Sequence, residues 1–383
     1  MPDKLKVCTV FGTRPEAIKM APVVLELQKR KDCEHVLIVT GQHRSMLDQM
    51  LDLFGLKPDY DLDIMLDRQT LTQVTTRALD GMESVLSEIA PDVVLVHGDT
   101  TTSFVGALAA YYEQIPVGHV EAGLRTGEKY NPFPEEINRH MIDVISDIYF
   151  TPTRSARDQL QREGVAKDRI FITGNTVIDA LLMVADRQEP EGFLEGVPDF
   201  TKVVLVEAHR RENLGEPMRE ICLGLRDIVR ARADVQVVFP VHLNPGVREP
   251  VYEILGDEPA VHLLEPQGYL PFVMLMKRAY VILTDSGGIQ EEAPSLGKPV
   301  LVLRTATERP EAVEARTAML VGPDREGIFE NTTRLIDERD FYEEMTASPN
   351  PYGDGTAAAR TVDSLLYHFG LSGRPPVDFS PRL

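Results

Sequence analysis

Carboxylates follow two apolar runs of this 383-residue sequence, and a third opens a helical pattern. Asp99 comes shortly after the run 93–96 and Glu121 directly after 117–120. A carboxylate at the end of a buried strand is costly unless it is paired or faces a cleft, so both are candidate acid/base groups. Glu135 is a third candidate, although acids are favoured at helix starts without any catalytic role.

A glycine and two cations lie where the apolar run 7–11 gives way to a helical pattern over 17–30. Gly12 lets a ligand approach the backbone, and Arg14 and Lys19 stand near the positive end of the helix dipole. The spacing is neither GxGxxG nor a P-loop. Anion binding and an ordinary turn between strand and helix therefore explain this loop about equally well.

The stronger indication of an anion site is Ser286-Gly287-Gly288, which comes after the run 281–283. Two glycines remove side chains where backbone N–H groups can cradle a diphosphate, and the serine hydroxyl is a further donor. Glu292, one helical turn later, can accept hydrogen bonds from ribose hydroxyls. The alternative is a glycine turn required only for close helix packing.

Further cations follow two other apolar runs. His209 and Arg210 come after 203–206, and Arg309 after 300–303. The chain carries a formal net charge of −20, which disfavours nucleic acid or an anionic membrane as a partner. Cations gathered at strand ends in such an acidic chain favour a small anionic ligand instead.

The elements that position these residues form two series of apolar runs separated by helical patterns. This alternation predicts an α/β protein with two Rossmann-like domains, each built on a parallel sheet, that face a central cleft. We expect residues 1–173 to carry the carboxylates and residues 174–355 to bind the anion. A C-terminal helix within about 356–383 can pack back on the first domain or on the second. The predicted strands are 7–11, 36–39, 93–96, 117–120, 203–206, 235–238, 261–264, 281–283 and 300–303.

Several classes of protein are disfavoured. No apolar run approaches the roughly 20 residues that span a bilayer, and residues 1–6 do not resemble a signal peptide. Cys8, Cys33 and Cys222 are widely spaced and form no CxxC pair, which favours buried thiols in a reducing compartment and no zinc site. The sequence is therefore interpreted as that of a cytoplasmic enzyme without a metal.

Taken together, these loops resemble one family, the non-hydrolysing UDP-N-acetylglucosamine 2-epimerases of bacteria. The resemblance implies a fold like that of the B-type glycosyltransferases, a homodimer and no nicotinamide or other cofactor. It departs from the family at Glu207-Ala208, where small or hydroxylated residues are commoner. The matching stretches are 11–19, 97–101, 118–126, 209–213 and 284–292.

The resemblance also implies roles for individual residues. Catalysis maps onto Asp99, Glu121, Glu135, Lys19 and His209. Binding of the uridine diphosphate (UDP) maps onto Arg14, His209, Gln267, Phe272, Ser286, Gly287, Gly288, Glu292 and Arg309. Some members bind a second UDP-N-acetylglucosamine as an activator, and that allosteric site maps onto Gln42, Arg68, Glu135, Arg210 and His242, with Ser45 where such members have glutamine.

The implied reaction explains why carboxylates and cations occur together. The C2 proton of the sugar is not next to a carbonyl, so loss of UDP from C1 must first activate it. Elimination to a glycal and re-addition give UDP-N-acetylmannosamine, a source of N-acetylmannosamine units for cell-surface polysaccharide. The rival hypotheses are a hydrolysing epimerase, a glycosyltransferase of the same architecture and a nucleotide-sugar sensor without turnover.

Overall fold

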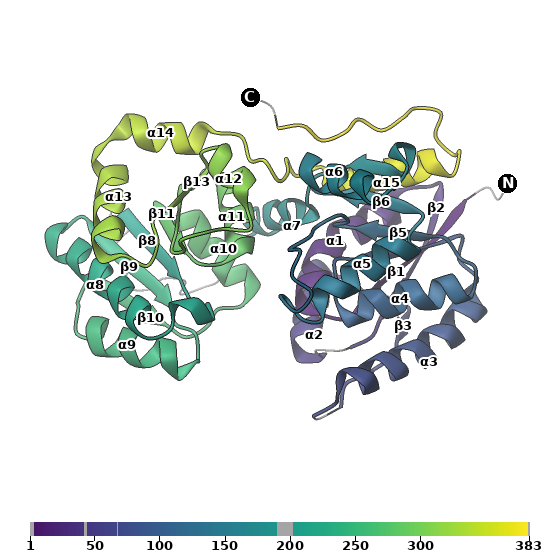
Figure 1. Cartoon of the computed structure of the whole chain (residues 1–383), viewed down its shortest axis with the longest axis horizontal. Coiled ribbons are helices and arrows are strands. Elements are labelled where there is room, and N and C mark those ends of the chain that lie inside the picture. Colours follow the sequence, from purple (N-terminus) through teal and green to yellow (C-terminus); the bar gives the residue numbers. More distant parts are fainter. Residues whose placement is uncertain (1–3, 42–43, 67, 190–201, 382–383) are drawn as a thin grey trace. The chain divides into compact units, whose positions relative to one another are not determined.

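The computed structural model describes residues 4–41, 44–66, 68–189 and 202–381, and the chain forms two compact units (Figure 1). Unit 1 contains the described residues up to Ala180 together with Tyr352–Ser380, and unit 2 those from Leu181 to Pro351. The boundaries between the two units therefore fall at residues 180/181 and 351/352. The sequence analysis predicted them at 173/174 and 355/356.

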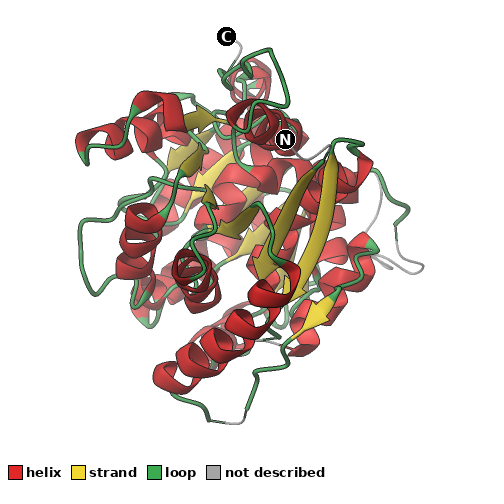
Figure 2. Ribbon diagram, turned by 90° about the vertical axis from the view of Figure 1, so that its right-hand side faces the viewer, coloured by secondary structure: helices red, strands yellow, loops and turns green. Residues whose placement is uncertain are grey.

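Unit 1 is built on a parallel sheet with the strand order β3-β2-β1-β4-β5-β6-β7. Figure 2 shows its strands lying among helices. The apolar side chains of β1, β4 and β5 are buried, as expected for a parallel sheet covered on both faces. The strands are β1 Leu5–Phe11, β2 Cys33–Val39, β3 Tyr60–Asp61, β4 Val93–His97, β5 Val117–Val120, β6 Ile148–Thr151 and β7 Ile170–Ile172.

The helices of unit 1 connect these strands, and a helix from the far end of the chain joins them. The last helix, α15, packs on α1, where Arg30 forms an ion pair of 2.8 Å with Asp363. Asp179 accepts hydrogen bonds from the first two N–H groups of α15. The helices are α1 Arg14–Lys29, α2 Arg44–Phe54, α3 Leu71–Ile89, α4 Thr101–Tyr112, α5 Glu135–Ile145, α6 Arg154–Arg162, α7 Thr176–Ala185, which crosses the unit boundary, and α15 Ala357–His368, with a 3-10 turn at Lys167–Arg169.

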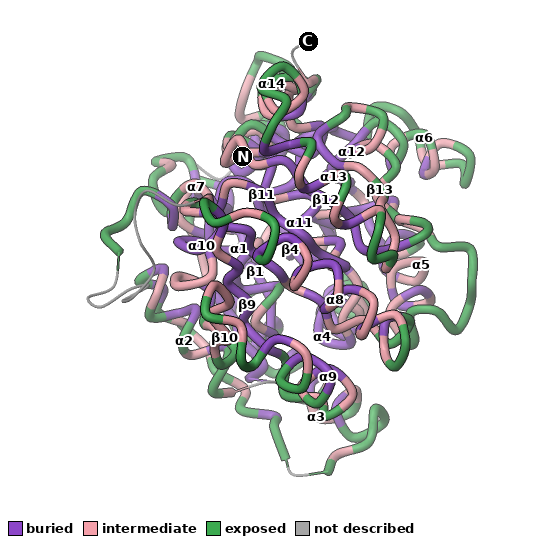
Figure 3. Tube along the Cα trace, turned by 90° about the vertical axis from the view of Figure 1, so that its left-hand side faces the viewer, coloured by how far each residue is buried: buried purple, intermediate pink, exposed green. Residues whose placement is uncertain are grey.

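Unit 2 repeats the same strand order, β10-β9-β8-β11-β12-β13, again all parallel. Its central strands are buried, as Figure 3 shows for β11 and β12. The strands are β8 Lys202–Glu207, β9 Val235–Pro240, β10 Val261–Leu264, β11 Val281–Thr284, β12 Val300–Val302 and β13 Ala318–Leu320. The helices are α8 Glu216–Ala231, α9 Pro245–Leu255, α10 Tyr269–Arg278, α11 Gly287–Glu292, α12 Pro310–Glu314, α13 Arg325–Asp337 and α14 Arg339–Ala347, with 3-10 turns at Arg211–Asn213 and Ala293–Leu296.

The prediction of two parallel α/β domains is confirmed, and each predicted apolar run lies in a strand or ends one residue beyond it. The sequence analysis missed β3, β6, β7 and β13. These strands are two to four residues long, but the predicted β5, β10, β11 and β12 are hardly longer, at three or four residues. The missed strands contain no valine, whereas every predicted run begins with this strand-favouring residue.

Both sheets reverse their strand order at a defined point, between β1 and β4 in unit 1 and between β8 and β11 in unit 2. In open α/β sheets, ligands bind outside the carboxyl ends of the strands at this point. The residues that follow these four strands are therefore the first place to look for a site. None of the helices in the described ranges is both long and apolar enough to cross a membrane.

Candidate active site

Glu121 is the most constrained carboxylate of unit 1. It directly follows β5 and has a φ of 67°, in the left-handed region that side chains other than glycine rarely adopt. The Glu121 and Ala122 N–H groups both donate to the carbonyl of Phe150, at 3.0 and 3.1 Å. Non-glycine residues in this conformation cost on the order of 1–3 kcal/mol and cluster at functional sites. The fold therefore holds Glu121 in place against a local preference.

Three polar side chains surround the Glu121 carboxylate, which is only 9% exposed. Lys19 Nζ lies 2.5 Å from Oε1, and the Asn175 amide donates to the same oxygen at 3.0 Å. His97 Nε2 lies 3.3 Å from Oε2. Burial lowers the pKa of His97 to about 3, so this imidazole is neutral at physiological pH. The arrangement is a carboxylate and an ammonium in contact within a shielded site, which suits proton transfer.

Asp99 and Glu135, the other two predicted carboxylates, lie at the loop after β4 and at the start of α5. Asp99 forms an ion pair with Arg139, and its carbonyl accepts a hydrogen bond of 3.0 Å from Asn138, so α5 is tied to the loop after β4. Glu135 is the first residue of α5 and is half-buried. The structure thus places Asp99 against α5, the helix that Glu135 begins.

Glu136, which the sequence analysis did not single out, is buried, whereas its neighbour Glu135 is half-buried. It accepts hydrogen bonds from the N–H groups of Thr126 and Gly127 at 3.0 Å and lies 3.2 Å from Arg139. Burial acts to raise the pKa of Glu136, but these partners outweigh it and lower the pKa. Glu136 is thus an ionised structural group that fixes the loop before α5.

His119 is fully buried and supports the same region. One ring nitrogen, Nδ1, lies 2.6 Å from Asp143 Oδ1, and the other donates to the carbonyl of Gly98 at 2.7 Å. Arg125 completes the cluster at 2.7 Å from Asp143 Oδ2. His119 therefore connects β5, α5 and the loop that carries Asp99.

Glu16 organises the loop after β1, and sequence reasoning missed it. Its buried carboxylate accepts hydrogen bonds from the N–H groups of Gly12 and Thr13 at 3.0 and 2.8 Å, and from the hydroxyls of Thr100 and Ser103 at 2.6 and 2.7 Å. The capping-box spacing of Thr13 and Glu16 was the available signal. Glu16 joins the loops after β1 and β4, the two strands at the switch point.

The reason for the glycine at position 12 differs from the one expected. A Cβ there would lie 1.9 Å from Thr40 Oγ1 and 2.7 Å from Thr102 Oγ1. Gly12 is thus required by packing between loops of unit 1, whatever ligand the loop binds. The predicted cation Arg14 is the half-buried first residue of α1.

In unit 2, Glu207, the last residue of β8, and His209, which follows that strand, form a close pair. His209 Nδ1 lies 2.6 Å from Glu207 Oε1, and Thr284 donates its hydroxyl to Glu207 Oε2 at 2.8 Å. The His209 ring stacks on His242, with centroids 5.1 Å apart and planes tilted by 13°. Two of the predicted activator residues are therefore neighbours of His209: Arg210 follows it in the sequence, and His242 stacks on its ring. Arg68 is an exposed residue of unit 1, and Gln42 lies outside the described residues.

Asp285 fixes the loop that carries His209. Its Oδ2 accepts the N–H groups of His209 and Arg210 at 2.9 and 2.8 Å and the amide of Asn213 at 2.9 Å. Burial raises the pKa of this carboxyl group. The loops after β8 and β11 are thereby held together at the switch point of unit 2.

Ligand atoms of Glu207, His209 and Asp285 all lie within 4.8 Å of one another, a spacing that can hold a metal ion. Most of these ligand atoms are already engaged in hydrogen bonds, and Asp285 Oδ1 is the buried oxygen of the three side chains that has no partner. Glu207 has both oxygens engaged, by His209 and Thr284, and Asp285 Oδ2 already accepts three donors. We interpret the three side chains as a hydrogen-bonded support.

Gly287 lies beneath two guanidinium groups. A Cβ at this position would lie 3.7 Å from Arg309 Cζ and 3.9 Å from Arg210 Nη2. Arg309 is oriented by an ion pair with the buried Glu291. The absence of a side chain at Gly287 leaves room for an anionic group next to both arginines.

The remaining predicted residues of unit 2 lie on the elements around this loop. The carboxylate of Glu292, at the end of α11, lies 3.4 Å from the Tyr269 hydroxyl. The Gln267 amide donates to the Glu265 carbonyl at 2.7 Å just before α10, and Phe272 is half-buried on α10. Ser286 is half-buried, and its N–H donates to Thr284 Oγ1 at 2.9 Å.

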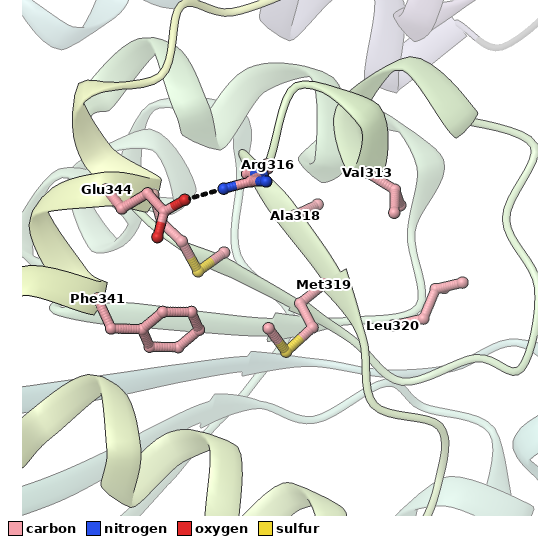
Figure 4. A pocket seen from close by; sticks show the side chains of 8 residues that line it. Val313, Arg316, Ala318, Met319, Leu320, Phe341 and Glu344 are labelled. Atoms are coloured by element: carbon pink, nitrogen blue, oxygen red, sulfur yellow. Dashed lines mark hydrogen bonds and ion pairs between the residues drawn. The ribbon is translucent and has the colours of Figure 1, made fainter. Parts of the chain in front are cut away.

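A cavity of about 430 Å³ lies elsewhere in unit 2, between α12, β13 and α14 (Figure 4). Its lining is mostly apolar, with the ion-paired Arg316 and Glu344 as its charged groups. None of the predicted site residues is among those that line it. The lining residues are Val313, Arg316, Ala318, Met319, Leu320, Phe341, Glu344 and Met345.

Comparisons with known proteins show which family the chain is similar to. The family model described as UDP-N-acetylglucosamine 2-epimerase matches residues 25–366. A UDP-N-acetylglucosamine 2-epimerase of Bacillus subtilis strain 168 is 54% identical over 379 residues, which cover 99% of this chain and 100% of that protein.

Solved structures extend the similarity. The crystal structure of UDP-GlcNAc 2-epimerase from Neisseria meningitidis bound to UDP-GlcNAc has a TM-score of 0.85 and 50% identity, covering 95% of this chain and 100% of that one. A glycosyltransferase of kitacinnamycin shares the fold alone, with a TM-score of 0.65 and 14% identity over 96% of this chain and 99% of that one.

Proposed function

This chain belongs to the UDP-N-acetylglucosamine 2-epimerase family of isomerases, and from that premise we propose that it inverts C2 of UDP-N-acetylglucosamine by eliminating and re-adding UDP. The product is UDP-N-acetylmannosamine, a source of N-acetylmannosamine units for cell-surface polysaccharide. The reaction needs no nicotinamide or other cofactor, because the hydrogen at C2 leaves as a proton and returns as one.

The order of steps follows from the chemistry of the sugar. Departure of UDP gives C1 oxocarbenium character, which acidifies the C2 proton and lets a carboxylate remove it to form a glycal. Return of a proton to the opposite face and re-addition of UDP complete the inversion. Two faces require two acid/base groups, or one group and an intermediate that moves.

The observation that carries this proposal is the environment of Glu121. The Glu121 carboxylate is only 9% exposed, lies 2.5 Å from Lys19 and belongs to a residue with a φ of 67°, a strained conformation that clusters at functional sites. Asp99 and Glu135 supply further carboxylates in the same unit. We assign these three acids and Lys19 to proton transfer.

The cations of unit 2 support the other half of the proposal. Arg309 and Arg210 lie over Gly287, and His209 follows β8. Such groups stabilise the negative charge that develops on a departing diphosphate. The residues that we assign to the UDP portion of the substrate are Arg14, His209, Gln267, Phe272, Ser286, Gly287, Gly288, Glu292 and Arg309.

Proton NMR in heavy water tests the reaction directly. Purified protein is incubated with UDP-N-acetylglucosamine and no nicotinamide. We expect UDP-N-acetylmannosamine carrying deuterium at C2, with a trace of glycal as the mark of elimination. An epimer that retains its original proton would contradict the mechanism.

The same spectra discriminate the rival functions. Free N-acetylmannosamine together with UDP would indicate a hydrolysing epimerase. Transfer of the sugar to an added acceptor would indicate a glycosyltransferase. An unchanged spectrum from folded protein that binds the nucleotide sugar would indicate a sensor.

We also propose that the chain forms a homodimer through unit 1. Tyr111 and Tyr112 on α4 are 60% and 64% exposed, and Val144 on α5, which packs on α4, is 85% exposed. Large exposed apolar groups on neighbouring helices are typical of an interface. Light scattering after gel filtration should give twice the chain mass, and Val144→Glu should reduce it.

A second molecule of UDP-N-acetylglucosamine is proposed as an activator, bound by Gln42, Arg68, Glu135, Arg210 and His242. The position of Arg210 beside Gly287 and the stacking of His242 on His209 support an activator next to the substrate. Initial rates should rise sigmoidally with substrate concentration. Strictly hyperbolic kinetics would contradict this part of the proposal.

A further inference from the structure

Glu207 is one of the two residues, with Ala208, at which this chain departs from the family it resembles, where small or hydroxylated residues are commoner. It is the last residue of β8 and pairs in register with Thr284 of β11. Its Oε2 accepts the Thr284 hydroxyl at 2.8 Å, and its Oε1 lies 2.6 Å from His209 Nδ1. The Glu207 side chain is only 18% exposed, whereas that of His209 is 39% exposed, so Glu207 is the better shielded member of the pair.

Several groups face the His209 ring. The hydrogen bond to Glu207 raises the pKa of His209, and the nearby Asp285 carboxylate adds to that effect. Burial and the Arg210 guanidinium act in the opposite direction but do not outweigh it. His242, from the loop after β9, stacks on the ring. The arrangement favours a charged imidazole whose Nδ1–H is donated to Glu207.

We propose that Glu207 is a positioning residue, which accepts the Nδ1–H of His209, keeps the ring as an imidazolium and leaves its Nε2–H to donate to an oxygen of the nucleoside diphosphate. This inference rests on the proposed function, since it assigns His209 to the anionic part of the substrate. It adds a role to Glu207, which the family resemblance leaves without one.

The net charge of residue 207 and His209 taken together explains why an acid is tolerated beside a diphosphate site. A hydroxyl at position 207 beside a neutral histidine carries no net charge, and Glu207 beside an imidazolium carries none either. The pair of Glu207 and the His209 imidazolium differs from the pair of a hydroxyl and a neutral histidine, because it is a dipole whose positive end is the imidazolium. A charge-assisted hydrogen bond to an anion is roughly twice as strong as a neutral one. Glu207 therefore extends tight diphosphate binding to higher pH.

Two variants test the proposal: Glu207→Gln, which keeps the shape without the charge, and Glu207→Thr, which restores a hydroxyl. The affinity for UDP is measured by calorimetry between pH 5.5 and 9, and the His209 ring is titrated by NMR, with His209→Gln to assign its signals. Thermal melts confirm that each variant is folded.

We expect the wild-type His209 to titrate above its ordinary pKa of 6.5 and each variant to titrate lower. The affinity of each variant for UDP should fall about fivefold at pH 8 and stay within about twofold at pH 5.5, where every ring is protonated. A loss that is equal at all pH values would indicate a merely structural role and overturn the proposal.

Two other results would also overturn it: a wild-type His209 that titrates at or below 6.5, or UDP binding that requires added Mn²⁺, since Glu207 would then act as a metal ligand. The ring titration needs no ligand, only the wild-type protein, the folded Glu207 variants and His209→Gln for the assignment. If UDP does not bind the wild-type protein at any pH, the proposed function fails, and the titration still decides whether Glu207 controls His209.

Discussion

The two units have the same strand order but place different chemistry at the switch point. In unit 1 the carboxylates of Glu16 and Glu121 are nearly buried and held by several partners each. In unit 2 the arginines and His209 are partly exposed around a glycine. Burial and fixed geometry suit proton transfer, whereas accessible cations beside a free backbone suit anion binding. The common fold places a candidate site at the switch point of each sheet, and the side chains there determine its chemistry.

The largest expected effect is on catalysis by unit 1. We expect Glu121→Gln to lower turnover of UDP-N-acetylglucosamine by about 10³-fold, because it removes a positioned acid/base group. The affinity for UDP should stay within about threefold, since Glu121 is not among the residues assigned to bind it. Steady-state kinetics and calorimetry measure the two effects.

Glu83→Gln is the matched control, because Glu83 is exposed on α3 of the same unit and should leave both quantities unchanged. If Glu121→Gln retained more than a tenth of wild-type turnover, the assignment of proton transfer to this carboxylate would be wrong. A large loss of UDP affinity would instead show that Glu121 also contributes to UDP binding.

Buried and exposed carboxylates should differ sharply in their effect on stability. Glu16→Ala leaves two backbone N–H groups and two hydroxyls of unit 1 without their partner, so the free energy of unfolding should fall by about 3 kcal/mol. Glu253 of unit 2 forms two hydrogen bonds with Arg219 at 2.8 and 2.9 Å, but the pair is exposed. Urea unfolding of Glu253→Ala should therefore match the wild type. Equal losses in both variants would refute this contrast.

Gly287→Ala tests the anion site of unit 2 with a single methyl group. The added Cβ meets Arg309 at 3.7 Å, an ordinary contact, so thermal stability should not change. The methyl group occupies the space assigned to the diphosphate, and the affinity for UDP should fall about tenfold, or by about 1.4 kcal/mol. Gly373→Ala, in open space within unit 1, should leave the affinity unchanged. Wild-type affinity in Gly287→Ala would place the phosphates elsewhere.

The smallest effects concern pH, where His35 of unit 1 and His209 of unit 2 should respond with opposite signs. Burial lowers the pKa of His35 to about 4, so only the unfolded chain binds its proton between pH 6.5 and 4, and stability falls as the pH drops through that range. The raised pKa of His209 gives a contribution that is present below pH 6.5 and is lost as the pH rises through the folded-state value.

Urea unfolding across pH checks both signs. His35→Gln should flatten the acid side of the stability profile by on the order of 1 kcal/mol, and His209→Gln should change only the neutral to alkaline side. A His35→Gln profile parallel to that of the wild type would contradict the assignment of a buried neutral imidazole.

The sequence alone determined the two α/β units, most of the strands and the polar loops at strand ends. This was possible because buried parallel strands are continuous apolar runs, and because Asp99, Glu121 and Ser286-Gly287-Gly288 begin within three residues of the end of such a run. It also identified the family through loops whose residues lie close together in the sequence.

Only the tertiary structure decided which side chains meet. Asn175 reaches Glu121 across 54 positions of sequence, and Glu16 joins the loops after β1 and β4. It also decided that Gly12 is required by packing and that Glu136, beside Glu135, is the structural acid. These contacts depend on strand order and on the direction of each side chain, because residues far apart in sequence become neighbours only when parallel strands end at one edge of a sheet.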